Sequence, residues 1–155
     1  MQLNKVCMSN KKIVNATPLS WGGIDFKSRL EVMVYKTLKE NNFNVEYEPE
    51  TVVIWEGYKP KTPYYTKNKK TGLLKEDVSK LRDITYTPDF KLIYEGIEIY
   101  VEAKGFANDT FPIKKKMFRK YLEGKNAMYF EVYSKKQVLQ MINIIKSYDV
   151  TKCNK

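Results

Sequence analysis

Apolar positions recur at helical spacing in some segments of the chain and alternate with polar positions in others. The helical period predicts helices over 28–41 and 134–148, and a third helix is expected to begin at Pro112, a favourable first-turn residue, and to continue through KKKMFRKYLE. The predicted strands are Val45–Glu48, Thr51–Trp55, Thr85–Tyr94, Ile97–Lys104 and Ala127–Tyr133. The element order is therefore helix, three or four strands, helix, strand, helix.

The same spacing assigns the buried faces of two helices. In the first helix the apolar positions at helical spacing are Leu30, Met33, Val34 and Leu38. In the last helix the expected buried positions are Val138, Leu139, Ile142 and Ile145. Both segments are therefore predicted to be amphipathic helices that pack on one side only.

Two segments lack a sustained period. Residues 1–24 are interpreted as an N-terminal arm, which leaves 25–150 as a single domain of a size that can bury its own core. Residues 56–83 are rich in Lys, Pro, Tyr and Gly and are predicted to form a long loop inserted into that domain. Loops of this length within a compact domain are usually functional or mobile.

A turn centred on Glu95-Gly96 would join two of the strands as a hairpin and place Tyr94 opposite Ile97. The resulting pairs on one face, Phe90 with Val101 and Leu92 with Ile99, are all apolar. A four-residue loop gives the same register, whereas a three-residue turn would oppose apolar to polar residues. Glu is not an ideal residue for a type I′ turn, so the register is predicted and the turn type is left open.

On the other face of this hairpin, Asp89 is expected directly opposite Glu102. Opposed Cβ atoms lie roughly 4.5–5.5 Å apart, so the two carboxylates would repel each other unless something compensates. Mg²⁺ commonly uses one or two carboxylates together with waters and a substrate phosphate, and is the natural agent. Lys104 shares the face of Glu102, with Ala103 turned away. The alternative is a solvated face that carries a simple Glu-Lys ion pair.

Composition narrows the chemistry that such a site could perform. The formal charge is +10, from 28 Lys and Arg against 18 Asp and Glu, which makes nucleic acid the leading partner. The chain has no histidine, so Ser-His-Asp hydrolysis, Cys-His proteolysis and every histidine-dependent nuclease mechanism are excluded. Carboxylates, lysines and tyrosines remain as candidates.

Cysteine usage and hydropathy indicate the compartment. Cys7 and Cys153 lie near opposite ends of the chain without CxxC or metal-ligand spacing, so neither a disulfide framework nor a zinc site is expected, which fits a reducing cytoplasm. The first residues lack the apolar run of a signal peptide, and no window approaches a membrane span. A cytoplasmic protein without a membrane partner is expected.

The motif PDF, at Pro88-Asp89, followed by a hairpin and by EAK, at 102–104, resembles the PD-(D/E)xK nuclease superfamily. More closely, SRLE at 28–31, then NFNVEYE, TYTPDF and VEAKG resemble phage endonuclease I, a family of Holliday junction resolvases, in the same order. Related phage proteins of unassigned function and the transposon-end nuclease subunit of Tn7-like elements share parts of the pattern. The resemblance covers about 28–133.

This resemblance implies an α/β fold with a restriction-endonuclease-like core, in which helices flank a mixed β-sheet in the order αβββαβ plus a C-terminal helix. It also implies a Mg²⁺-dependent DNA endonuclease that acts on branched DNA, in which Mn²⁺ substitutes for Mg²⁺ and the product carries a 5′-phosphate. If the chain is phage-encoded, its compartment is the host cytoplasm. A metal-bound water has a pKa near neutrality, so such an enzyme needs no histidine.

Carried over residue by residue, the resemblance implies that Asp89 and Glu102 bind the metal and that the carbonyl of Ala103 completes its shell. Lys104 would orient the attacking water or stabilise the phosphorane. Glu31 would be a fourth catalytic member that contacts a second metal. The alternative for Glu31 is purely structural, because Ser28-x-x-Glu31 is also a capping box.

Two basic segments are the predicted DNA-binding surfaces. The helix that begins at Pro112 carries Lys114, Lys115, Lys116, Arg119 and Lys120. The loop over 56–83 adds Lys67, Lys69 and Lys70 among other lysines, with tyrosines interleaved, and it could clamp a backbone or stack on exposed bases. Solvated, non-binding lysines are the alternative. The loop is longer than its counterpart in the resolvase family, whose dimer exchanges a strand there, so a homodimer is left open.

Two other functions stay open at this point. One is a sequence-specific or transposon-end nuclease of the same fold, and the other is a DNA-binding module that does not cut. The chain has three arginines, Arg29, Arg82 and Arg119, against 25 lysines. This balance favours contacts with phosphates over fork-like readout of bases, and hence recognition of DNA structure over sequence.

Overall fold

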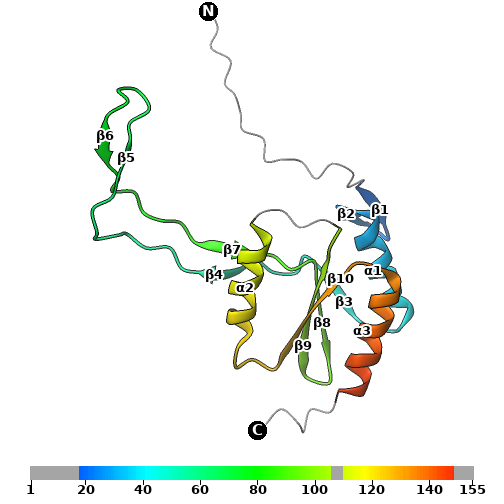
Figure 1. Ribbon diagram of the computed structural model, residues 1–155. Coiled ribbons are helices and arrows are strands. Elements are labelled where there is room, and N and C mark those ends of the chain that lie inside the picture. Colours follow the sequence, from blue (N-terminus) through cyan, green and yellow to red (C-terminus); the bar gives the residue numbers. More distant parts are fainter. Residues whose placement is uncertain (1–17, 106–109, 149–155) are drawn as a thin grey trace, which may run out of the picture.

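The computed structural model describes residues 18–105 and 110–148, and a four-stranded mixed sheet lies at its centre (Figure 1). Its strands, in spatial order, are β10 (Ala127–Val132), β9 (Ile97–Ala103), β8 (Phe90–Tyr94) and β3 (Val45–Tyr47). β9 and β10 are parallel, whereas the other two pairs are antiparallel.

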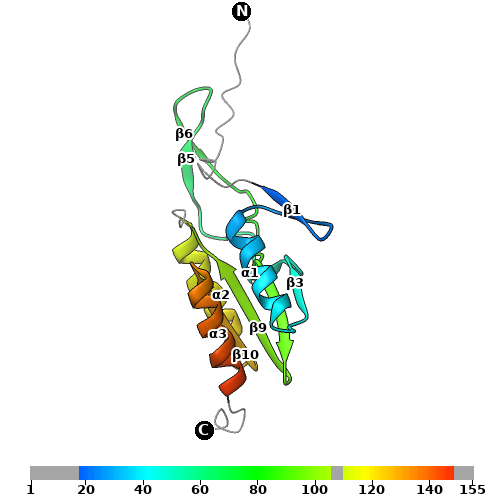
Figure 2. The same cartoon turned by 90° about the vertical axis from the view of Figure 1, so that its right-hand side faces the viewer.

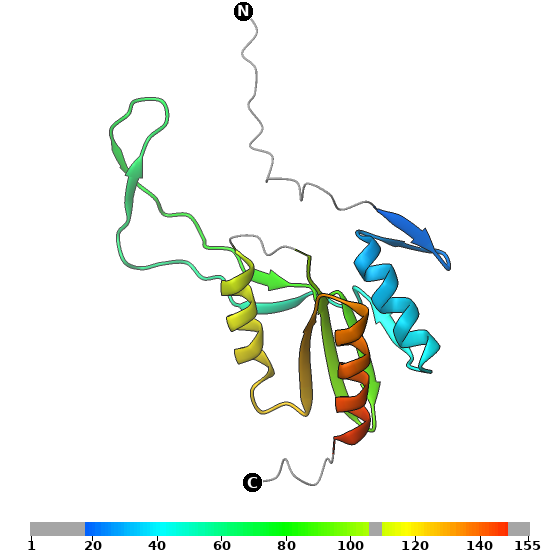
Figure 3. The same cartoon turned by 45° about the vertical axis from the view of Figure 1, so that its right-hand side comes forward.

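Three helices cover the two faces of this sheet. Helices α1 (Arg29–Glu40) and α3 (Lys135–Ser147) lie on one face, and α2 (Phe111–Leu122) lies on the other (Figure 3). The order α1, β3, β8, β9, α2, β10, α3 agrees with the predicted order. The predicted α/β class, with a mixed sheet flanked by helices, is therefore confirmed.

The β8–β9 hairpin has the predicted register. Tyr94 pairs with Ile97, and the apolar pairs Phe90 with Val101 and Leu92 with Ile99 follow. Glu95 has φ 49° and Gly96 has φ 79°, which is the backbone pattern of a type I′ turn. The turn type that the sequence left open is thus settled, with a glutamate at a position that asparagine or glycine usually fills.

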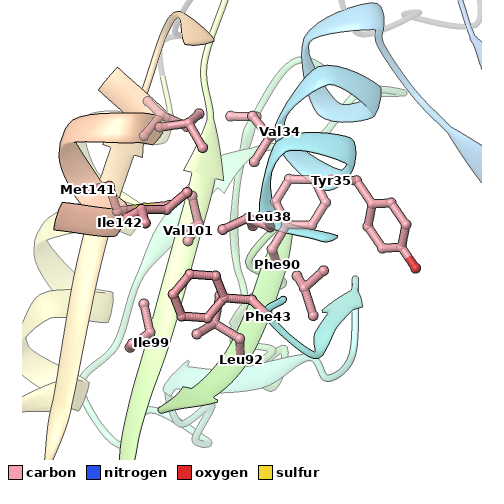
Figure 4. Close-up of a cluster of buried hydrophobic side chains, with 14 of the residues drawn as sticks. Val34, Tyr35, Leu38, Phe43, Phe90, Leu92, Ile99, Val101, Met141 and Ile142 are labelled. Atoms are coloured by element: carbon pink, nitrogen blue, oxygen red, sulfur yellow. The ribbon is translucent and has the colours of Figure 1, made fainter. Parts of the chain in front are cut away.

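The main core lies between the sheet and the pair α1 and α3 (Figure 4). Val34 and Leu38 of α1 are one helical turn apart, and both belong to the buried cluster that includes Val101 of β9. In α3, Val138 and Ile142 are buried as predicted, but the prediction for Leu139 was wrong, because its side chain is 42% exposed. Leu139 follows Val138 by one residue, which turns it about 100° away from the core.

A second core lies on the opposite face of the sheet, under α2. It contains Phe111 and Phe118 of α2, Tyr100 of β9, and residues of a separate two-stranded sheet. That sheet pairs β4 (Val52–Trp55) with β7 (Ile84–Tyr86). The predicted strand 85–94 is therefore two strands, β7 and β8, which belong to different sheets. The break includes Pro88, whose ring nitrogen cannot donate to a strand ladder.

Residues 19–26 correct the prediction of an irregular arm over 1–24. β1 (Leu19–Trp21) and β2 (Ile24–Phe26) form a hairpin whose turn is Gly22-Gly23, with φ of 60° and 80°. Phe26 enters the main core, and Trp21 packs against Tyr35 of α1 with ring centroids 5.8 Å apart. The rest of the predicted arm, residues 1–17, lies outside the described residues.

The insertion over 56–83 contains a hairpin that extends away from the rest of the protein (Figures 1 and 2). Its strands are β5 (Tyr65–Lys67) and β6 (Leu74–Glu76). The predicted long loop is therefore partly regular structure. None of the helices in the described part of the chain is long and apolar enough to cross a membrane.

Candidate active site

Asp89 and Glu102 meet at the open end of the β8–β9 hairpin. Asp89 immediately precedes β8, and its Oδ2 accepts a hydrogen bond of 2.8 Å from the backbone N–H of Ala103. Glu102 is the penultimate residue of β9 and is buried. The register of the hairpin thus brings the two predicted carboxylates and Ala103 together, as the sequence analysis expected.

The Asp89 carboxyl is strongly perturbed by these surroundings. Burial raises its pKa to about 8, and the negative charge of Glu102 adds to this increase. Glu31 raises the pKa further, whereas the hydrogen bond from Ala103 and the positive charge of Lys104 lower it. Asp89 therefore lies among like charges that the protein itself only partly offsets.

Lys104 lies beside Glu102 and reaches back toward α2. Its Nζ is 2.9 Å from Glu102 Oε1 and 3.6 Å from the centroid of the Phe111 ring. The carboxylate and the aromatic ring both contact the ammonium group, so they fix the position of Lys104 Nζ beside Glu102. A simple Glu-Lys ion pair was also expected from the non-catalytic alternative, so this contact does not separate the two readings.

Two tyrosines complete the surroundings of Glu102, and sequence reasoning missed both. The Tyr86 hydroxyl donates a 2.5 Å hydrogen bond to Glu102 Oε2 and lies 3.0 Å from the Tyr129 hydroxyl. Burial and the negative charge of Glu102 raise the pKa of Tyr86, so its hydroxyl stays protonated and can donate. One available signal was the alternation in β10, where Tyr129 and Glu131 share a face.

Glu131 forms a second ion pair next to the site. The parallel register of β9 and β10 pairs it with Glu102. Its Oε1 lies 3.0 Å from Lys115 Nζ, and its Oε2 accepts a hydrogen bond of 3.1 Å from the Tyr133 hydroxyl. Lys115, which was predicted to contact DNA, is therefore engaged in tying α2 to the sheet.

Glu31 is held in place by several donors. Its Oε1 accepts from Ser28 Oγ at 2.8 Å, and its Oε2 accepts from the backbone N–H of Lys27 at 2.9 Å and from the Tyr47 hydroxyl at 2.6 Å. Ser28 Oγ in turn accepts from the Glu31 N–H at 3.2 Å, as in a capping box. The structural role is therefore present, and the catalytic role stays a prediction, supported by the effect of Glu31 on the pKa of Asp89.

The predicted DNA-binding residues fall into separate groups. On α2, Lys114 donates to the Thr85 carbonyl at 2.9 Å and Lys115 pairs with Glu131. The other basic residues of α2 are exposed, namely Lys116, Arg119 and Lys120. Lys67, Lys69 and Lys70 are also exposed but lie on the projecting hairpin, away from the four-stranded sheet (Figure 1). The structure therefore places the two basic surfaces apart.

Few oxygen donors in the described part of the chain lie where they could bind a metal ion together. Within 18–105 and 110–148, no group of three or more Asp, Glu or Cys side chains has an arrangement for a metal ion. Asp89 and Glu102, with the backbone of Ala103, supply two carboxylates and a carbonyl, and Mg²⁺ and Mn²⁺ accept such oxygen donors together with water. The mutual repulsion of the two carboxylates is what a divalent cation would relieve, so these residues fit the expected ion.

Residues 11–139 match a protein family described as "Protein of unknown function (DUF1064)". No curated protein matches the chain, and no solved structure matches it.

Proposed function

We propose that this chain, which belongs to the DUF1064 family, is a metal-dependent DNA endonuclease with a restriction-endonuclease-like core that cuts branched DNA such as Holliday junctions. The observation that supports this most is the meeting of Asp89 and Glu102 at one end of the sheet, with Lys104 Nζ 2.9 Å from Glu102. A carboxyl group with a perturbed pKa, as Asp89 has, beside a lysine is typical of functional sites.

Asp89, Glu102 and the carbonyl of Ala103 would hold Mg²⁺ or Mn²⁺. When bound, such a cation lowers the pKa of a bound water toward neutrality and offsets negative charge, which suits a chain without histidine. Lys104 would orient the attacking water or donate to the negative charge that develops on the phosphate. Glu31, held by donors from the two residues before α1 and from β3, would be the fourth member of the site and its third carboxylate.

Recognition of DNA structure is supported by the kind of basic residues that are exposed. Lysine acts as a point charge toward phosphates, whereas bidentate readout of guanine most often uses arginine. Arg119 is accompanied on the exposed side of α2 by Lys116 and Lys120. Such a surface would respond to the positions of DNA backbones, which differ between a four-way junction and a linear duplex.

The test compares two four-way junctions of unrelated sequence with linear duplexes made from the same arms, in Mg²⁺ and in EDTA. The proposal expects similar cutting of both junctions, weaker cutting of the duplexes and no cutting in EDTA. Asp89→Asn should abolish cutting while binding survives, and Glu46→Gln, at an exposed position of β3, is the matched control.

Each other result assigns a different function. Equal or better cutting of linear duplex at one sequence would identify a site-specific or transposon-end nuclease. Binding of DNA without cutting under any divalent cation would identify a DNA-binding module. Cutting by Asp89→Asn at the wild-type rate would refute the site itself.

A further inference from the structure

We propose that residues 57–82, which we call the arm, insert into a groove of duplex DNA. The arm would thereby bind a segment of DNA other than the strand that lies at the Asp89–Glu102 site. This inference rests on the proposed DNA substrate and adds a second contact to it. In the views of Figures 1 and 3, the arm extends away from the four-stranded sheet and the helices that cover it.

Neither face of the β5–β6 ribbon is covered by the described part of the chain. The pairs Tyr65 with Glu76 and Lys67 with Leu74 share one face, on which Tyr65 is 57% and Leu74 is 76% exposed. An isolated two-stranded ribbon is marginally stable in water, so a ribbon with bare apolar side chains indicates a binding partner.

The opposite face of the ribbon carries the same kinds of residues. Thr66 pairs with Lys75 there, and Tyr64 and Leu73 continue the alternation with exposures of 62% and 71%. A ribbon that lies on a flat surface hides one face only. Tyrosine, lysine and leucine on both faces instead indicate a partner that encloses the ribbon, as the walls of a groove do.

The charge of the arm selects the kind of partner. It contains eight basic residues, Lys59, Lys61, Lys67, Lys69, Lys70, Lys75, Lys80 and Arg82, against two acidic residues, Glu76 and Asp77. A net charge of +6 on one short segment repels a second copy of the same arm and attracts a polyanion. The major groove of B-DNA is about 12 Å wide, admits a two-stranded ribbon and is bordered by phosphates on both sides.

Hydrogen bonds and a close approach of the backbone join the two ends of the arm at its base. The Gly57 N–H donates to Asp83 Oδ1 at 2.7 Å, and the Leu81 N–H donates to the Tyr58 carbonyl at 2.9 Å. A Cβ atom at Gly57 would lie 2.2 Å from the Leu81 carbonyl oxygen, so only glycine allows this approach. The arm is thus fixed where it leaves β4 and rejoins β7, and its ordering costs less when DNA binds.

The experiment measures binding of the full-length protein to a linear duplex of mixed sequence in EDTA, where no cutting occurs, over a range of salt concentrations. Lys67→Gln with Lys75→Gln should weaken binding. The plot of log binding constant against log salt concentration should also become shallower, because about two phosphate contacts are lost and each contributes roughly 0.9 to its slope. Tyr65→Ser with Leu74→Ser should weaken binding severalfold. The matched control is Lys135→Gln with Lys136→Gln, which makes the same change of charge on exposed positions of α3.

Wild-type affinity and salt slope in both arm variants would overturn the inference. It would also be overturned if light scattering showed a wild-type dimer that becomes a monomer in Tyr65→Ser with Leu74→Ser, because the arm would then be a subunit contact. If the wild-type protein cuts none of the substrates but the arm variants bind duplex more weakly than wild type, the proposed nuclease is refuted and the inference stands. If the wild-type protein cuts as proposed but the arm variants bind duplex as wild type does, the inference is refuted and the proposed nuclease stands.

Discussion

The Tyr86 hydroxyl donates a 2.5 Å hydrogen bond to Oε2 of Glu102, and both residues are only 6% exposed. A buried carboxylate that accepts such a bond cannot rotate freely, so Tyr86 fixes the direction in which Glu102 presents its other oxygen. That oxygen, Oε1, faces Lys104. Tyr86 is therefore a positioning residue for the proposed site.

Tyr86→Phe should lower the cleavage rate and raise the Mg²⁺ concentration needed for half-maximal activity, each by about 10- to 100-fold, as is usual when a partner of a metal-binding carboxylate is lost. The measurement is a magnesium titration of single-turnover cleavage. Tyr94→Phe is the matched control, because Tyr94 lies on the other face of the sheet against Phe43. An unchanged magnesium requirement in Tyr86→Phe would assign the tyrosine to folding alone.

Lys104→Ala should reduce the single-turnover rate by roughly 100-fold, the order expected when one donor to a developing charge is removed, and leave DNA affinity nearly unchanged. Lys116→Ala, at an exposed position of α2, should do the opposite. Lys115→Ala is unsuitable for this comparison, because the ion pair of Lys115 with Glu131 ties α2 to the sheet. If Lys104→Ala lost affinity and kept its rate, the lysine would be an ordinary phosphate contact.

Glu31→Gln and Ser28→Ala separate the two roles of the capping box. Ser28→Ala removes the cap and should lower the free energy of unfolding by about 1 kcal/mol. It should slow cleavage less than Glu31→Gln does, because Glu31 keeps its charge and its hydrogen bonds from Lys27 and Tyr47. Glu31→Gln should slow cleavage at least about tenfold if its charge serves the site. Urea unfolding and single-turnover cleavage of both variants check this, and a Glu31→Gln variant with the wild-type rate would leave Glu31 as a cap only.

Asp89 should make the stability of the metal-free protein depend on pH. Its pKa is about 8 in the folded protein against 3.8 for an ordinary aspartate, so between these values the folded state keeps a proton that the unfolded chain has released. The contribution of Asp89 to stability is therefore present below about pH 4 and is lost as the pH rises to about 8.

Asp89→Asn removes this loss. The difference in free energy of unfolding, variant minus wild type, should be larger at about pH 8 than at about pH 4 by more than about 1.4 kcal/mol. That amount corresponds to a shift of a single pKa unit. Urea unfolding in EDTA at the two pH values measures the difference. A gain that is the same at both values would show that Asp89 ionises normally.

The hairpin and its carboxylates could be predicted from the sequence because their geometry is local. Alternation fixes which residues share a face, and a turn at Glu95-Gly96 fixes the register, so Asp89 and Glu102 follow. The tyrosines could not be found in this way, because Tyr86 and Tyr129 are 43 residues apart and meet only through the packing of two sheets.

Short elements without an apolar period were also missed. β1 and β2 have three residues each and are held by the turn at Gly22-Gly23 and by Phe26 in the core. β5 and β6 are mostly polar and bury neither face, so no hydrophobic pattern marks them. Leu139 shows the opposite error, because it is apolar and adjacent to the buried Val138, yet it lies on the exposed side of α3.

The proposed site lies where the four-stranded sheet meets the β4–β7 sheet, and the ring of Phe118 packs between the two sheets. Phe118 is fully buried, with its ring centroid 4.6 Å from that of Tyr86 on the β4–β7 sheet and 5.3 Å from that of Tyr100 on the four-stranded sheet. A smaller side chain at this position would let the sheets close on each other and would shift the Tyr86 hydroxyl relative to Glu102. Residue 118 therefore governs the geometry of the carboxylates without touching them, and the alignment of the site is a property of the core beneath it.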